Sequence, residues 1–190
     1  MMSEILLPHG GFEDLKSFQL ARLIFDITAR FSEMYIDAKS RTRDQMTQAA
    51  RSGVQNIAEG SEAAATSRKT ELKLTNVARA SLVELQLDYQ DFLRQHELTE
   101  WDKDHPALMD FKQRRISDIT AFRSWVQDMR KSMPDMRQSA IVANGALSLL
   151  NLTIFLLKKQ LEKQAAAFEQ EGGFTEHLYA VRQKNRRKTS

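Results

Sequence analysis

The stretch ARSGVQNIAEG, residues 50–60, decides the fold because it places glycine and apolar residues at helical spacing. Val54 and Ile57 are three residues apart, so they share one face of a helix, and Gly53 lies beside them. Glycine inside a helix costs about 0.5–1 kcal/mol relative to alanine. We therefore expect another helix to approach the backbone closely at Gly53. Gly60 stands where a glycine commonly follows the last residue of a helix, so it is predicted to end this one.

A second helix is predicted directly after the polar linker SEAAATS, residues 61–67. The first helix of the pair covers about 43–60 and the second about 68–95, with Thr66 or Ser67 as its N-cap. The apolar stripe of the second helix consists of Leu74, Val77, Ala78, Ser81, Leu82, Leu85, Tyr89 and Phe92. The two helices form a helical hairpin.

Two further long helices are predicted at about 13–37 and about 135–170. The last one contains the most apolar stretch, ALSLLNLTIFLL (146–157), which is shorter than the roughly 20 residues of a membrane span. We interpret it as a buried helix of a protein with no membrane partner. The stretch is apolar nearly all round, whereas one stripe suffices for a four-helix core. The surplus face predicts a homo-oligomer, unless other parts of the chain cover it.

The residues at about 100–135 look inserted before that last helix. A polar loop, HELTEWDKDH (96–105), leads to Pro106, which suits the first turn of a helix. Apolar spacing then predicts one or two shorter helices over 106–131. We expect Trp101 and Trp125 to be packing anchors. These helices are the candidates for covering the surplus apolar face.

Composition favours a mainly helical protein, because 190 residues include only 7 glycines and 3 prolines. The sequence has no cysteine, which excludes disulfides, zinc–thiolate sites and thiol catalysis. No signal-peptide pattern is visible at the N-terminus, and a cysteine-free chain suits a reducing compartment. We therefore expect a cytoplasmic location and an all-α fold.

The net charge of +3 is unevenly placed along the chain. The last ten residues hold five basic residues and no acid, and the rest of the chain has 23 basic and 25 acidic residues. The basic residues of this tail are Arg182, Lys184, Arg186, Arg187 and Lys188. They form either a solvated chain end or a contact to the phosphates of RNA or DNA.

Motifs that would indicate catalysis, a cofactor or a metal are missing. The four histidines form no H-x-x-x-H or E-x-x-H pair, so a di-iron bundle site is not indicated. No phosphate-binding glycine loop and no G-x-S-x-G occur. Glu59 and Glu84 could meet across the two helices of the hairpin, either as solvated or salt-bridged side chains or as an acid–base pair. We predict no catalytic, cofactor-binding or metal-binding residues and identify no small-molecule substrate.

The stretch QAARSGVQNIAEGSEAAATSRKTELKLTNVARASLVEL (48–85) resembles the four-helix bundle family that includes the 23S-rRNA intervening-sequence proteins. The matches are Gln48, Ala49, Ala50, Ser52, Asn56, Ile57, Ala58, Glu59 and Gly60, followed by Ala78, Ser81, Leu82, Glu84 and Leu85. FEDLKSFQLA (12–21) also looks like the start of that family's first helix, so the resemblance covers about 12–95. The C-terminal part resembles a subgroup with a suffix after the bundle. We therefore divide the chain into a bundle over 1–170 and a suffix with the basic tail over 171–190.

The resemblance implies a left-handed up-down bundle of four helices, often assembled as a ring of five, without known catalytic activity. Some relatives, including accessory proteins of diversity-generating retroelements, look like basic rings that bind nucleic acid and a reverse transcriptase. The family motif is structural in this interpretation; its residues are Gly53, Asn56, Ile57, Glu59, Gly60, Ser81 and Glu84. A partly buried Asn56–Glu59 pair would need partners, such as linker amides or Arg79.

The expected function is therefore a non-enzymatic, oligomeric scaffold or a nucleic-acid-associated accessory protein. The alternative is an enzyme of unknown reaction whose pocket is formed by the inserted helices.

Overall fold

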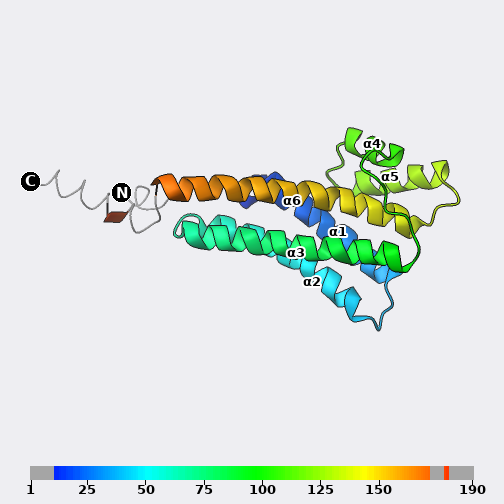
Figure 1. Ribbon diagram of the computed structural model, residues 1–190, viewed down its shortest axis with the longest axis horizontal. Helices are drawn as coiled ribbons and strands as arrows, with labels where there is room; N and C mark the ends of the chain where they lie inside the picture. Colours follow the sequence, from blue (N-terminus) through cyan, green and yellow to red (C-terminus); the bar gives the residue numbers. More distant parts are fainter. Residues whose placement is uncertain (1–10, 172–177, 180–190) are drawn as a thin grey trace, which may run out of the picture.

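The computed structural model describes residues 11–171 and 178–179, and all regular structure among them is helical (Figure 1). This confirms the all-α fold class. The elements are the 3-10 helix η2 (Phe12–Asp14) and the α-helices α1 (Lys16–Tyr35), α2 (Arg41–Ala63), α3 (Arg68–Gln95), α4 (Pro106–Gln113), α5 (Ile119–Ser132) and α6 (Gln138–Glu171). The basic tail lies outside the described residues.

Four of these helices form the bundle. Each of α1, α2, α3 and α6 packs against the next, and α6 closes the ring by packing against α1. Figure 1 shows α3 and α6 side by side along the length of the molecule, with α4 and α5 at one end of α6. Successive bundle helices run in opposite directions, because short connections join α1 to α2 and α2 to α3.

The helix starts follow the side-chain chemistry of the residues that precede them. Ser67 is the N-cap of α3, since its hydroxyl accepts a hydrogen bond from the Thr70 N–H, as predicted for this position. Pro106 occupies the first turn of α4, also as predicted, and Asp118 caps α5 by accepting from the Ala121 N–H. The bounds of α3 agree with the sequence prediction of 68–95.

The hairpin of α2 and α3 is tightest at Gly53. A Cβ atom at Gly53 would lie 2.6 Å from Cδ2 of Leu82, which is 0% exposed, so the predicted close approach at this glycine is confirmed. The prediction that Gly60 ends the helix is wrong, because α2 continues to Ala63. Gly60 is instead a second close contact: a Cβ atom there would lie 3.3 Å from Cβ of Leu74 and 3.5 Å from the Glu71 carbonyl oxygen.

A buried polar contact joins two helices inside the apolar core of the bundle. The hydroxyls of Thr28 and Tyr89 are 3.1 Å apart and join α1 to α3, and both residues are fully buried. Burial raises the pKa of the Tyr89 phenol well above its usual value, so this group stays a neutral hydrogen-bonding partner. Phe31 and Phe92 pack around it, with ring centroids 4.8 Å apart.

The inserted residues cover the first part of α6 on its outer face. Gly145 allows this contact, because a Cβ atom there would lie 2.8 Å from the ring of Trp125 and 2.9 Å from that of Phe122. Trp125 is fully buried and Trp101 nearly so, which confirms their predicted role as packing anchors. The loop before α4 is held by Asn144, whose Oδ1 accepts from the Trp101 N–H at 2.8 Å and whose Nδ2 donates to the Thr99 carbonyl at 3.0 Å.

The apolar part of α6 is longer than the 12 residues counted from the sequence. Residues 138–170 form one helix whose most apolar 18-residue window has a mean hydropathy of 2.0, enough by length and composition to cross a membrane. In this structure 61% of that window is buried inside the bundle. A mostly buried core helix meets the same criteria of length and composition as a membrane-spanning helix.

Candidate functional site

The family-motif residues lie at the α2–α3 contact and hold the two helices together. The hydroxyls of Ser52 and Ser81 are 2.9 Å apart across the two helices. The Asn56 amide Nδ2 donates to the Ser52 hydroxyl at 3.1 Å and to the Ser52 carbonyl at 2.9 Å. Ile57 is buried in the core beside them. Asn56 therefore finds its partners on its own helix and, through Ser52, at Ser81.

The two motif carboxylates do not join this network. Glu59 is exposed and forms no hydrogen bond or ion pair with another described residue, so neither linker amides nor Arg79 bind it. Gly53 lies opposite Leu82 and Gly60 opposite Thr75, which places Glu59 near the level of Thr75. Glu84 is nine residues further along α3, roughly 13 Å at 1.5 Å per residue. The suggested meeting of Glu59 and Glu84 is therefore wrong.

The predicted nucleic-acid contacts, Arg182, Lys184, Arg186, Arg187 and Lys188, lie outside the described residues. The cations of the bundle that sequence reasoning would consider next are not gathered in one place. Arg41 and Arg43 lie at the start of α2, Arg51 lies near its middle, and Arg68 and Lys69 lie at the start of α3. The length of α2, roughly 33 Å, separates these two pairs.

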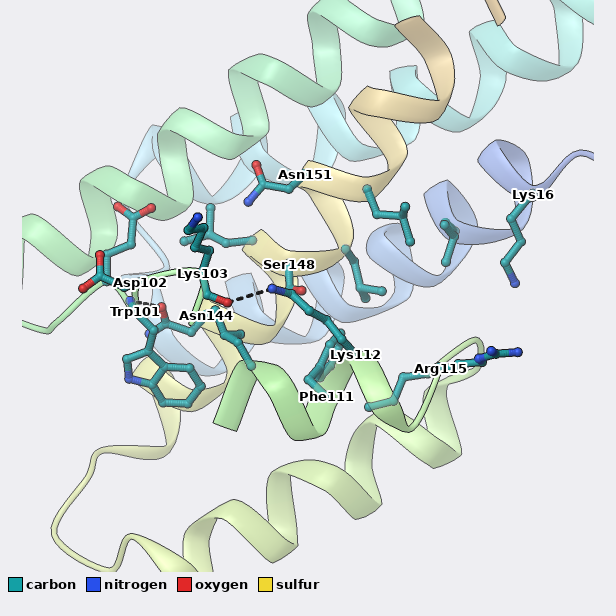
Figure 2. A pocket seen from close by; sticks show the side chains of 17 residues that line it. Lys16, Trp101, Asp102, Lys103, Phe111, Lys112, Arg115, Asn144, Ser148 and Asn151 are labelled. Atoms are coloured by element: carbon teal, nitrogen blue, oxygen red, sulfur yellow. Dashed lines mark hydrogen bonds between the residues drawn. The ribbon is translucent and has the colours of Figure 1, made fainter. Parts of the chain in front are cut away.

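A pocket lies under α4, between the outer side of α6 and the first turns of α1 (Figure 2). Its volume is about 1000 Å³. Apolar side chains form much of its lining; they are Leu20, Leu108, Phe111, Ile116, Leu147, Leu149 and Leu152. Trp101 lines it from the loop before α4, with its ring stacked on His105 at a centroid distance of 4.5 Å.

Charged side chains of this pocket are divided between its two ends. Figure 2 shows Lys16 and Arg115 at one end, and Trp101, Asp102 and Lys103 at the other. Lys112 lies between them and donates to the Lys103 carbonyl oxygen at 2.8 Å. Lys16 and Arg115 form no ion pair within the part of the chain that the structure describes.

Arg115 has an unusual backbone conformation. It follows the C-cap of α4 with φ at 49°, in the left-handed region that glycine adopts without cost. Glu97 holds the equivalent position after α3, with φ at 55°. Arg114, directly before Arg115, bridges Asp110 at 2.8 Å and Asp128 at 2.7 Å, and this guanidinium lowers the pKa of Asp128.

One carboxylate of α3 has a clearly perturbed pKa. Burial raises the pKa of Asp88 to about 6, and the neighbouring Glu84 and Asp91 add to the shift. Asp88 lines a small pocket with Asp91, Asp37 and His96, about 240 Å³ in volume. Residues 11–171 and 178–179 contain no group of three or more side chains placed to hold a metal ion.

No family model, no curated protein and no solved structure matches this chain. The resemblance to the four-helix bundle family therefore stays a prediction, which depends on the motif residues of 48–85.

A pocket at the inserted helices entered the sequence-based predictions only as part of the alternative function, and none of the residues that line it was assigned to such a site. Lys16, Arg115 and Asn144 come from three separate elements, and no short-range spacing links them. The available signal for Asn144 was a polar residue at the start of the most apolar helix, where a buried amide needs partners.

Proposed function

We propose that this protein is a non-enzymatic subunit of a homo-oligomer and acts as a scaffold or as an accessory protein of a nucleic acid. The observation that carries the proposal is the exposed apolar surface on the outer side of α6 and α3. Phe155 is 52% exposed and Leu152 is 46% exposed, both on α6, and Leu87 on α3 is 57% exposed. Large apolar side chains gathered on one face favour a protein–protein contact.

These three side chains come from neighbouring parts of the two helices. Gln86 Nε2 donates to Asn151 Oδ1 at 2.6 Å, so the residues directly after each of them, Leu87 and Leu152, lie at the same level of the bundle. Phe155 follows Leu152 by three residues and is on the same side of α6. We call the surface formed by Leu87, Leu152 and Phe155 the α3–α6 patch.

The inserted helices leave this patch uncovered. They contact the first part of α6, where Gly145 meets Trp125 and Phe122, and all residues of 140–147 are buried. Further along α6 the outer positions become exposed, beginning with Asn151 and Leu152. The chain thus covers only the first part of the surplus apolar face, and a second copy is the proposed cover for the rest. A closed ring, with five subunits as the resemblance implies, would let every copy use the same contact.

A phosphate-binding role has independent support from a groove between α1 and α5. Arg30, Arg123 and Arg130 line this groove, whose volume is about 320 Å³, and Arg30 is also paired with Glu33 at 3.1 Å. Several cations along one groove favour contacts to a phosphate backbone rather than to base edges. In a homo-oligomer the groove and the basic tail would be repeated, which raises avidity without a new kind of contact.

The alternative function, an enzyme with a pocket formed by the inserted residues, is favoured by the existence of the pocket under α4. Ser148 is the hydroxyl among its lining residues, and it is hydrogen-bonded to no histidine or carboxylate of the described residues. A nucleophile activated by a base needs such a contact. Binding is therefore better supported than catalysis at this pocket.

Self-association is tested by replacing Phe155 with glutamate and measuring the mass by light scattering after size-exclusion chromatography. Each chain has a mass of 21.8 kDa. We expect the parent protein to elute at a multiple of this mass and Phe155→Glu to shift towards the single chain, because a buried charge disfavours an apolar interface. Met34→Glu is the matched control, since Met34 is also 52% exposed but lies on α1. Equal masses for both variants would contradict the α3–α6 patch as the interface.

The nucleic-acid part is tested by titrating RNA and DNA at several salt concentrations. Each neutralised phosphate should contribute a slope of about −0.7 to −0.9 in log affinity against log salt. Truncation after Ala180 should reduce the slope if the tail binds, and Arg123→Ala with Arg130→Ala should reduce it if the groove does. Parent protein that binds no nucleic acid at low salt would rule out this part of the proposal.

A further inference from the structure

We infer that the pocket under α4 is a binding site for an amphipathic anion, a molecule with an aliphatic chain and one carboxylate head group. The aliphatic chain would lie along the leucine-rich lining, and the carboxylate would lie between Lys16 and Arg115. The pocket shares Leu152 with the α3–α6 patch, but Lys16 and Arg115 lie outside that patch.

The size and lining of the pocket suit a chain rather than a small polar molecule. A volume of about 1000 Å³ lies at the upper end of the range for pockets that hold a drug-sized ligand. Leu20 on α1, Phe111 on α4 and Leu149 on α6 line it from three sides. An apolar chain placed there would be removed from water on each of these sides, which is favourable in proportion to the apolar area covered.

The charges favour an anion at the α1 end. Lys16 and Arg115 are exposed cations at that end (Figure 2), and no carboxylate of the described residues pairs with either. The two lining acids, Glu100 and Asp102, lie with Trp101 at the opposite end, and Glu100 already accepts a hydrogen bond from Gln90 at 3.0 Å. Lys103 also lies at that opposite end, so acids and cations are mixed there, whereas the charged lining residues at the α1 end, Lys16 and Arg115, are both cations. A carboxylate is therefore attracted more strongly to the α1 end, which orients the chain.

The backbone conformation of Arg115 supports a role for its side chain in ligand binding. Its left-handed conformation suits glycine, and a side chain at such a position is disfavoured by its own Cβ atom. Glycine would fit this backbone better but has no side chain, so it could not make the contact with the ligand that we assign to the guanidinium of Arg115. Glu97 is in the same backbone conformation but does not line the pocket, so the two positions form a matched pair.

The experiment compares the parent, Arg115→Gly and Glu97→Gly by isothermal titration with dodecanoate below its micelle concentration. Both variants should unfold at the same temperature as the parent or higher, because glycine relieves the backbone in each. We expect one dodecanoate per chain in the parent, roughly ten-fold weaker binding in Arg115→Gly, and unchanged binding in Glu97→Gly. A loss of that size corresponds to one charge-assisted hydrogen-bonded contact.

Dodecanol, which lacks the carboxylate, and acetate, which lacks the long chain, show how much each part of the ligand contributes to the affinity. Dodecanol should bind more weakly than dodecanoate to the parent, and acetate should bind too weakly to detect. Equal binding of dodecanol and dodecanoate, unchanged binding in Arg115→Gly, or no binding to the parent would overturn the inference. Binding of the parent to anionic vesicles without binding to dissolved dodecanoate would also overturn it, in favour of a membrane surface. Arg115 lies outside the α3–α6 patch, so Arg115→Gly should not change self-association. Masses measured on the same samples therefore distinguish a failure of the proposed ligand binding from a failure of the proposed self-association.

Discussion

Replacing each of the two α2 glycines with alanine tests the packing of the hairpin. Both Gly53 and Gly60 are inside α2, so each substitution gains about the same helix propensity, roughly 0.8–1 kcal/mol. The substitutions differ in what the new Cβ atom meets on α3. At Gly53 it would lie 2.6 Å from Cδ2 and 2.9 Å from Cγ of Leu82, whereas at Gly60 the shortest distance is 3.3 Å.

Leu82 is 0% exposed, so its side chain cannot move out into water and has to shift against its buried neighbours. Overpacking of this kind typically costs about 1–3 kcal/mol. Gly53→Ala should therefore be about 1–3 kcal/mol less stable than Gly60→Ala, and Gly60→Ala should be close to the parent or somewhat more stable. In a chain of this length a difference of 1 kcal/mol corresponds to about 2–4 °C in the unfolding temperature.

The assay is urea unfolding followed by circular dichroism at one fixed protein concentration, since self-association would make stability depend on concentration. Gly53→Leu should be still less stable. Adding Leu82→Ala to Gly53→Ala should cost less than Leu82→Ala costs alone, because the two residues are in contact. If Gly53→Ala is as stable as Gly60→Ala, the contact with Leu82 does not restrict α2, and the reasoning about the hairpin is refuted.

Two further substitutions test the buried polar contacts. Asn144→Ala leaves the Trp101 N–H and the Thr99 carbonyl without partners and should lower the free energy of unfolding in urea by about 2–3 kcal/mol. The control Asn151→Ala, at an exposed position of the same helix, should lower it by under about 0.5 kcal/mol. Similar losses for the two variants would contradict the role of Asn144. Asp88 binds its proton more tightly in the folded state, where its pKa is about 6, than in the unfolded state, where it is about 3.9. Its contribution to stability should therefore rise as the pH falls from about 7 to about 4, so Asp88→Asn should flatten the dependence of the unfolding free energy on pH; parallel curves for parent and variant would contradict the raised pKa.

The parts of the fold that depend on local sequence could be predicted. The apolar spacing and the serine before Arg68 defined α3 to its observed bounds. The cost of glycine inside a helix indicated the close approach at Gly53. Both arguments concern one helix and its immediate neighbour along the chain, where spacing determines which face a residue occupies.

The parts that depend on distant segments could not be predicted. Gly60 looked like a helix end because glycine is common there, yet it serves the contact with α3. Gly145 serves the contact with α5 in the same way, and its partners Phe122 and Trp125 lie on that separate helix, 23 and 20 residues before it in the sequence. The pocket requires α1, α4 and α6 together, and the left-handed backbone of Arg115 follows from how α4 ends rather than from its residue type.

Sedimentation equilibrium of the parent protein tests the central proposal most directly, namely that the uncovered α3–α6 patch joins copies of the chain. Over about 1–100 µM the account predicts one mass that is a multiple of 21.8 kDa, with five chains as the number implied by the family resemblance. A mass of 21.8 kDa throughout that range would contradict the proposal, because Leu87, Leu152 and Phe155 would then remain in contact with water.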